Sequence, residues 1–341
     1  MDKNNNGFDL LRLLLAFLVF VSHSYLLFGH GREPLDVFSK GQTSMGEIGV
    51  MGFFCLSGYL ISASFYRSPN VLKFLRNRFL RLFPGYWVCL LVTAFVIAPL
   101  IFYVNNKSLT GFGFTGPDSS WSFVYNNIYL FIRQWGICGL LVNANYKGSL
   151  NGNLWSLLPE FMCYLLTLVL GLFGLLKNNR FVFAIVFIFV YVVYVVNLYT
   201  SNQFGPTFLI LSSARKLYTA YFCGTALFVF RDKLQVDVKG VLFIALAMIA
   251  LLKFGGFLIV APLCITLLCI KGFSLFKMSF KYDISYGLYI YAFPVQQLIS
   301  AVYAPNTLMI FYMLSCAVVT ALLAFLSYVA VERPFLNFKA K

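Results

Sequence analysis

Charged residues are scarce in this sequence. They make up 11% of its 341 residues, apolar residues make up 60%, and the mean hydropathy is +0.82. An ordinary soluble domain carries about 25% charged residues. The composition therefore excludes an ordinary soluble domain and predicts a polytopic membrane protein, in which several helices cross the bilayer.

Histidine is scarce too, and no C-x-x-C motif occurs. The chain has two histidines and eight cysteines. Cys138 is expected in an external loop, whereas apolar runs contain Cys55, Cys89, Cys163, Cys223, Cys264 and Cys316. Zinc sites need clustered Cys and His ligands, and disulfide frameworks need paired cysteines. The sequence therefore predicts neither a metal site nor a disulfide framework.

Separate soluble domains, low-complexity tracts and internal repeats are not evident either. The first apolar run lacks a small-residue cleavage pattern and is followed by many more runs, so we expect it to be a retained span and no signal peptide. Residues 1–341 are therefore expected to form a single membrane-embedded domain.

What the sequence does have is a series of apolar runs long enough to cross a bilayer. They predict an all-α bundle of about ten transmembrane helices. The runs lie at about 8–28, 45–65, 84–104, 153–175, 181–199, 207–230, 240–254, 256–271, 284–303 and 308–331. Lys253, Gly255 and Gly256 interrupt the seventh and eighth runs, which are either two short helices or one broken helix.

Positive charge is unevenly distributed along the chain. The formal net charge of +15 would suggest a nucleic-acid partner in a soluble protein. A cytoplasmic N-terminus puts most basic residues on the cytoplasmic side, in segments 67–81, 177–180, 231–239, 271–281 and 333–341. Because cytoplasmic loops are rich in Lys and Arg, both termini are predicted to be cytoplasmic, and no nucleic-acid partner is expected. The longest segment between spans, about 105–152, is then external and resembles a lid.

A few ionisable residues lie inside the apolar runs, where charge is costly and often functional. They are Arg12, His23, Glu160, Arg215 and Lys216. Arg12 and His23 are eleven residues apart, which in a helix is three turns plus about 20° and about 16 Å of rise. Both are therefore predicted on one helix face, Arg12 toward the cytoplasm and His23 toward the outside. The alternative is that His23 packs through a hydrogen bond and Arg12 reaches the headgroups.

The side chain of His23 suits the removal of a proton from a hydroxyl near neutral pH. A carboxylate bound to its second ring nitrogen would fix the tautomer. Glu160, in LWSLLPEF, is expected at a comparable depth and is a candidate for this role. The alternative is that Glu160 pairs with Arg215 or Lys216, and the sequence leaves both alternatives open.

A pair of arginines precedes the third apolar run. Arg78 and Arg81, in FLRNRFLRLFPGYW, are expected on the first cytoplasmic loop, just before Pro84. Residues three apart are neighbours on a helix face, and guanidinium groups bind phosphate through paired hydrogen bonds. The pair predicts a cytoplasmic anchor for a phosphorylated ligand. The alternative is that this basic segment only fixes the topology and contacts anionic lipid.

Small residues gather in GVMGFFCLSGYLIS, residues 49–62. Gly49, Gly52, Ser57 and Gly58 let another helix or a ligand approach the backbone closely. This stretch predicts close packing and no reaction.

Taken in order, these stretches resemble the acyltransferase 3 family of bacterial membrane acyltransferases. The matching pieces are FDLLRLLLAFLVFVSHS, FFCLSGYLIS, RNRFLRLFPGYW, LWSLLPEFMCYLL, YDISYGLYIYAFPVQQ and VERPF, which run from residue 8 to 335. Many members have a histidine before the aromatic-Pro pair of the late motif. This chain has Ala292 there, so any role of a second histidine is absent.

The resemblance implies a ten-helix O-acyltransferase of the bacterial cytoplasmic (inner) membrane. Such an enzyme moves an acyl group, usually acetyl, from cytoplasmic acyl-CoA to a hydroxyl of an extracytoplasmic glycan: O-antigen, capsule, exopolysaccharide or a lipid-linked sugar. By position, His23 and Glu160 match the catalytic residues, and Arg12, Arg78 and Arg81 match residues that serve the acyl-CoA. Segment 105–152 is where the choice of acceptor is expected to be determined.

Two other classes of function remain open. In a transporter of a polar or anionic solute, Arg12, Glu160, Arg215 and Lys216 would line a path. Repeated halves or paired broken helices would favour a transporter, and the sequence shows neither. A membrane scaffold would tolerate neutralisation of the charges inside its spans.

Overall fold

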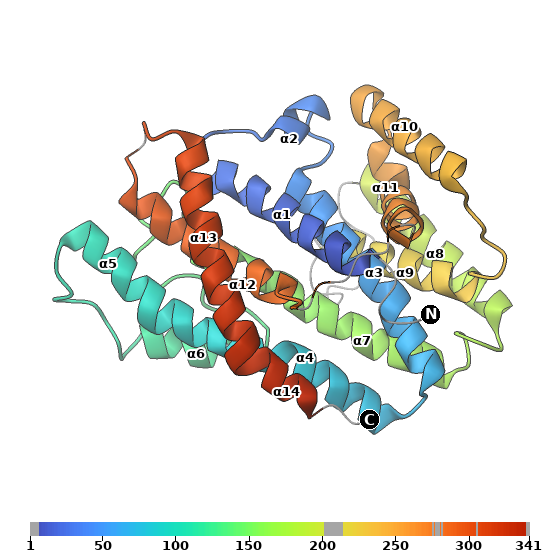
Figure 1. Ribbon diagram of the computed structural model, residues 1–341, viewed down its shortest axis with the longest axis horizontal. Coiled ribbons are helices and arrows are strands. Elements are labelled where there is room, and N and C mark those ends of the chain that lie inside the picture. The colour runs from blue at the N-terminus through green and yellow to red at the C-terminus, as the bar shows by residue number, and fades with distance from the viewer. Residues whose placement is uncertain are drawn as a thin grey trace. The chain divides into compact units, whose positions relative to one another are not determined.

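The computed structural model of the chain describes residues 7–200, 214–274, 276, 280, 282–304 and 306–338. Within these residues every regular element is a helix and no strand occurs (Figure 1). The start of the predicted span 207–230 lies outside the described residues, as do the basic residues at positions 277, 281, 339 and 341.

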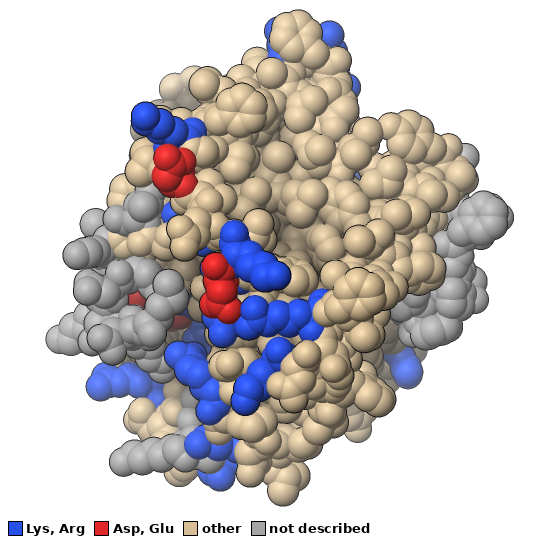
Figure 2. Space-filling model, turned by 90° about the vertical axis from the view of Figure 1, so that its right-hand side faces the viewer, with Lys and Arg blue, Asp and Glu red and all other residues tan. Residues whose placement is uncertain are grey.

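Six helices of the described chain are long and apolar enough to cross a membrane. They cover Phe8–Leu27, Met45–Arg67, Val71–Asn106, Gly152–Leu172, Arg180–Tyr199 and Met309–Asn337, and a shorter apolar helix covers Phe257–Gly272. On the face drawn in Figure 2, uncharged residues cover most of the surface, and Lys and Arg outnumber Asp and Glu. The helices are those of a multi-pass membrane protein. The count of ten transmembrane helices and the cytoplasmic position of the termini stay predictions.

Apolar side chains on these helices face outward. In α8 (Arg180–Tyr199), only 11% of the most apolar stretch of 18 residues is buried inside the protein. Phe181 and Phe189 are 77% and 68% exposed. So large an apolar surface is unfavourable in water but suits a bilayer.

The chain folds into two compact units. The first contains residues 1–18, 34–74 and 159–280, and the second contains residues 19–33, 75–158 and 281–341. Three helices contribute residues to both units: α1 (Phe8–Leu27), α4 (Val71–Val92) and α7 (Leu157–Leu172). The predicted single membrane domain stays a prediction.

Six further helices belong to the first unit: α2 (Pro34–Phe38), α3 (Met45–Arg67), α8 (Arg180–Tyr199), α9 (Arg215–Val229), α10 (Val238–Phe254) and α11 (Phe257–Leu267). A π-helical turn extends α11 to Gly272. α10 and α11 are separate helices, because Gly255 and Gly256 adopt φ values of +112° and +85° that favour glycine. Of the two alternatives for this stretch, the structure shows two short helices.

The closest helix contact in this unit joins α3 and α9. Side-chain atoms added at Gly58 or Gly224 would overlap the backbone oxygens of Tyr221 and Cys55. The hydroxyls of Ser62 and Thr225 bond across the same interface at 3.2 Å. The close packing expected for residues 49–62 is therefore present at Gly58, where small residues let two helix backbones meet.

The second unit contains the remaining helices. They are α5 (Ala98–Asn106), α6 (Ser120–Asn127), α12 (Ser285–Val302), α13 (Met309–Ser327) and α14 (Arg333–Asn337), with short turns of other helix types at Thr93–Ile97, Gly152–Ser156 and Tyr328–Glu332. Between α6 and Gly152 the chain has no helix, and this stretch supplies walls of the cavity described below.

A proline in α12 sets the path of the chain before Gly152. Pro294 has no backbone N–H, so the carbonyl of Ile290, four residues earlier, lacks its helical donor. That carbonyl instead accepts hydrogen bonds from Asn151 Nδ2 at 3.0 Å and Cys89 Sγ at 3.3 Å. In an apolar bundle a freed carbonyl must find such donors, so Pro294 fixes Asn151 beside α12.

We expect Gly58→Ala to destabilise the protein by about 1–3 kcal/mol or more, because the added methyl forces the α3 and α9 backbones apart. Thermal unfolding of the purified protein in detergent measures this as a lower Tm. Gly272→Ala is the matched control, since its Cβ would make an ordinary 3.6 Å contact with Val241. Equal Tm values for the two variants would contradict the proposed packing.

Candidate active site

His23 lies in a cavity of about 350 Å³ in the second unit. The other lining residues are Leu26, Trp135, Tyr146, Gly148, Ser149, Gly152, Trp155 and Phe293. The rings of His23 and Phe293 meet edge to face, with centroids 5.0 Å apart and planes at 73°. Nδ1 of His23 is buried and has no hydrogen-bond partner in the described part of the chain. A buried ring nitrogen without a protein partner can bind a group of a ligand.

Two neighbouring glutamines of α12 hold segments that line this cavity. The Nε2 group of Gln296 donates to the carbonyl of Phe20 at 2.9 Å and to the hydroxyl of Ser24 at 2.7 Å, on either side of His23 in α1. The Nε2 group of Gln297 donates to the carbonyls of Ser149 at 2.8 Å and Tyr146 at 3.1 Å. Both glutamines are buried. They therefore hold α1 and the loop before Gly152 against the same helix.

Segment 105–152, the predicted lid, supplies more than half of the lining. Five of the nine lining residues belong to it: Trp135, Tyr146, Gly148, Ser149 and Gly152. Its own hydrogen bonds keep its shape: the amide of Leu150, for example, donates to the carbonyl of Trp135 at 2.7 Å. The segment thus forms an ordered wall of the His23 cavity.

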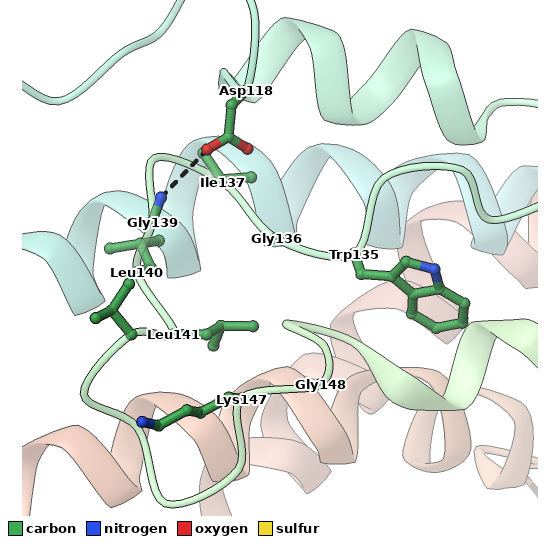
Figure 3. A pocket seen from close by; sticks show the side chains of 10 residues that line it. Asp118, Trp135, Gly136, Ile137, Gly139, Leu140, Leu141, Lys147 and Gly148 are labelled. Carbon is green, nitrogen blue, oxygen red and sulfur yellow. Dashed lines mark hydrogen bonds between the residues drawn. The ribbon is translucent and has the colours of Figure 1, made fainter.

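A second hollow, of about 390 Å³, adjoins the first and shares Trp135 and Gly148 with it (Figure 3). Asp118 lies at one rim, where its carboxylate accepts a hydrogen bond from the Gly139 amide at 3.2 Å, and Lys147 lies across the hollow from it (Figure 3).

Cys138 holds the rim of this second hollow together. Its backbone amide donates to the Asp118 carbonyl at 2.9 Å, and its Sγ lies 3.4 Å from the same oxygen. Burial raises the pKa of the Cys138 thiol, so the thiol stays protonated and remains a donor.

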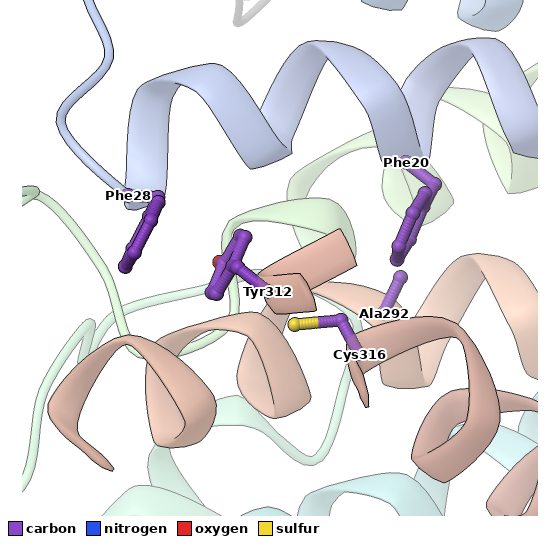
Figure 4. Packing of buried hydrophobic residues seen from close by; sticks show 5 residues of the cluster. All are labelled: Phe20, Phe28, Ala292, Tyr312 and Cys316. Carbon is purple, nitrogen blue, oxygen red and sulfur yellow. The ribbon is translucent and has the colours of Figure 1, made fainter. Parts of the chain in front are cut away.

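The C-terminal half of α1 packs on α12 and α13 through an apolar cluster (Figure 4). Its buried members are Phe20, Phe28, Ala292, Tyr312 and Cys316. Phe28 stacks on Tyr312 with ring centroids 4.2 Å apart. Ala292, from the late YIYAFP stretch, is thus part of the apolar packing.

The arginine pair lies in a helix and not on a loop, which differs from the sequence expectation. α4 begins at Val71, and Pro84 lies inside it. The sequence predicted a helix that starts at Pro84, but the residues before the proline form helix readily and extend the helix backward. Arg81 forms a salt bridge of 3.1 Å with Asp283 and lies 6.0 Å from the ring centre of Tyr286. Arg78 lies one turn earlier in α4, as the spacing predicts.

The other predicted site residues belong to the first unit. Arg12 forms a salt bridge of 2.9 Å with Asp9 on α1. Glu160, in the first turn of α7, accepts a hydrogen bond from the Tyr164 hydroxyl. Lys216 bonds to Glu47, and Arg215 bonds to Asn197. Whether Glu160 orients His23 or pairs with Arg215 or Lys216 stays open.

Gln296, Gln297 and Ser149 are not among the residues predicted from the sequence. The predicted residues are ionisable, whereas these three side chains are neutral. Two adjacent glutamines in a predicted span were a usable signal, because buried amides in a membrane need partners on other segments.

A multi-pass helical bundle with a histidine in an aromatic cavity defines a membrane protein with an enzyme-like pocket. The family model described as "Acyltransferase domain" matches residues 5–329. The chain therefore belongs to the acyltransferase 3 family and is a membrane acyltransferase.

Curated relatives support this membership. An O-acetyl transferase of Shigella phage Sf6 is 32% identical over 348 residues, which cover 98% of this chain and 96% of the relative. Nodulation protein 10 of Rhizobium leguminosarum bv. viciae is 36% identical over 85 residues, or 25% of this chain and 23% of that protein. No solved structure matches the chain.

We expect Gly152→Ala to lower acyl transfer by about 100-fold while the protein still folds. A Cβ at Gly152 would lie 2.6 Å from the Phe293 ring and 2.8 Å from Ser149 Oγ, so the cavity wall must shift, and small displacements cost large factors in rate. Acyl-transfer assays on membranes with matched protein levels measure the effect. Gly136→Ala, with an ordinary 3.8 Å contact, is the control and should stay near wild type. Full activity of Gly152→Ala would show that the reaction does not use this cavity.

Proposed function

We propose that the protein is an O-acetyltransferase of the bacterial inner membrane that moves an acetyl group from cytoplasmic acetyl-CoA to a hydroxyl of an extracytoplasmic glycan. The observation that carries the proposal is His23, which has an unpartnered ring nitrogen in a cavity walled by the predicted external segment. The name of the phage relative, O-acetyl transferase, supports the acetyl group and the hydroxyl acceptor.

The reaction needs one base. His23 takes the proton of the acceptor hydroxyl while the hydroxyl oxygen attacks the thioester carbonyl carbon. The C–S bond then breaks, and the CoA sulfur leaves as a thiolate that takes the proton from His23. The products are the acetyl ester and free CoA. In the alternative, His23 first takes the acetyl group itself and then passes it to the acceptor.

Basic residues are proposed to bind the donor. Arg78 and Arg81 occupy one face of α4, and their guanidinium groups suit the phosphates of CoA, with Arg12 as a further contact. Arg81 already binds Asp283, so a phosphate would share or replace that carboxylate. Glu160 is proposed to orient His23.

Aromatic residues are proposed to bind the acceptor. Trp135, Tyr146, Trp155 and Phe293 line the His23 cavity. Their rings offer apolar faces to the C–H surface of a sugar, and the indole and phenol groups add polar contacts for its hydroxyls. Such a lining suits a polysaccharide or a lipid-linked sugar.

The proposed topology follows from the distribution of basic residues. We infer ten transmembrane helices in one membrane domain, with both termini in the cytoplasm. In this arrangement the acyl donor and the glycan acceptor reach the protein from opposite faces of the bilayer.

We expect His23→Ala to reduce glycan acetylation at least 100-fold, because the reaction loses its base. Mass spectrometry of glycan from cells with matched protein levels measures the effect. His30→Ala is the control and should acetylate normally. His30 lies beyond α1, where its ring stacks on Phe28 and its Nδ1 lies 3.3 Å from the Phe28 carbonyl oxygen, and it does not line the His23 cavity. Wild-type acetylation by His23→Ala would refute the mechanism.

We expect a fluorescent protein fused after residue 341 to fluoresce, because the C-terminus is proposed to be cytoplasmic. Alkaline phosphatase, which is active only outside the cytoplasm, should be active when inserted at Gly111. Gly111 is exposed, and a Cβ added there would have no neighbour within 4 Å. The reverse pair of results would overturn the topology.

A further inference from the structure

Ser149 carries the second unpartnered polar atom of the His23 cavity. Its side chain is 2% exposed, and its Oγ has no hydrogen-bond partner in the described part of the chain. Among the residues that line the cavity, only His23 and Ser149 have such an atom. Folding normally pairs buried hydroxyls, so an unpaired one indicates a partner that the chain itself does not supply.

The backbone carbonyl of Ser149 accepts a hydrogen bond, whereas its hydroxyl makes none within the described chain. The Gln297 amide fixes the Ser149 carbonyl at 2.8 Å. No described residue bonds the Oγ, and a serine side chain has three staggered χ1 positions, so the hydroxyl can turn toward a ligand without breaking a bond.

The surroundings of Ser149 connect it to His23. A Cβ at Gly152 would lie 2.8 Å from Ser149 Oγ and 2.6 Å from the Phe293 ring, and the same ring contacts His23. Gly152 therefore leaves the space in which the Ser149 hydroxyl and the Phe293 ring lie side by side, next to the proposed base.

We propose that Ser149 is a catalytic residue whose hydroxyl donates a hydrogen bond to the carbonyl oxygen of the acetyl group. This inference rests on the proposed function. When the acceptor oxygen bonds to the thioester carbon, the carbonyl oxygen gains negative charge and keeps it until the C–S bond breaks. Ser149 stays neutral, keeps its proton and forms no covalent bond. A hydroxyl that turns onto this oxygen and donates to it stabilises the oxyanion.

Ser149→Ala in the full-length protein tests the inference. In detergent or proteoliposomes, with acetyl-CoA and the glycan acceptor, kcat should fall about 100-fold or more while the KM values stay within about threefold. Its Tm should equal or exceed that of the wild type, because the hydroxyl it loses makes no bond in the fold.

Ser156→Ala is the matched control. Ser156 is also buried, but its hydroxyl bonds to the Tyr289 hydroxyl at 2.7 Å and the Asn153 carbonyl at 3.1 Å, and it does not line the cavity. This variant should lower Tm and change kcat far less than Ser149→Ala. A Ser149→Ala kcat within threefold of wild type, an effect on KM alone, or a Tm as low as that of Ser156→Ala would overturn the role of Ser149. Wild-type protein that transfers no acetyl group would overturn the proposed function itself.

Discussion

Two buried amides on one helix determine the cavity of the second unit. Gln296 and Gln297 are adjacent in α12 and therefore face different directions, about 100° apart around the helix. One donates to α1 on either side of His23, and the other donates to the loop that carries Tyr146 and Ser149. Because an apolar bundle offers no water to such amides, each must bind a specific acceptor, and the two walls are fixed together.

α12 also fixes a third part of the wall, because one of its carbonyls has no donor within the helix and binds a residue of that wall. Pro294 leaves the Ile290 carbonyl open, and Asn151 binds it two residues after Ser149. Hydrogen-bonded amide groups thus fix the walls of a cavity in which His23 and Ser149 keep polar atoms without partners in the described chain. Sites at which a protein leaves such atoms unpaired are commonly functional, because a ligand completes them.

Much of the helical framework could be predicted from the sequence. The break at Gly255 and Gly256 follows from residues that favour positive φ, and the runs at 284–303 and 308–331 correspond closely to α12 and the helix that begins at Met309. The start of α4 was wrong because a proline was taken to begin a helix that in fact passes through it.

The candidate site was predictable only in part. A histidine in an apolar run is visible in the sequence, and the structure places it in a cavity. Ser149 is not distinctive by residue type, and the two adjacent glutamines indicate only that they have partners on other segments. Their importance depends on contacts between residues more than a hundred positions apart, and spacing along one chain does not reveal such contacts.

We propose that acetyl groups pass from a cytoplasmic donor to an external acceptor at the His23 cavity. The most direct measurement uses proteoliposomes of the purified protein with the glycan enclosed and radiolabelled acetyl-CoA supplied only on the cytoplasmic face of the protein. The account predicts that label accumulates as an ester on the enclosed glycan. Label that enters as a free solute, or that never reaches the glycan, would contradict the account and favour a transporter.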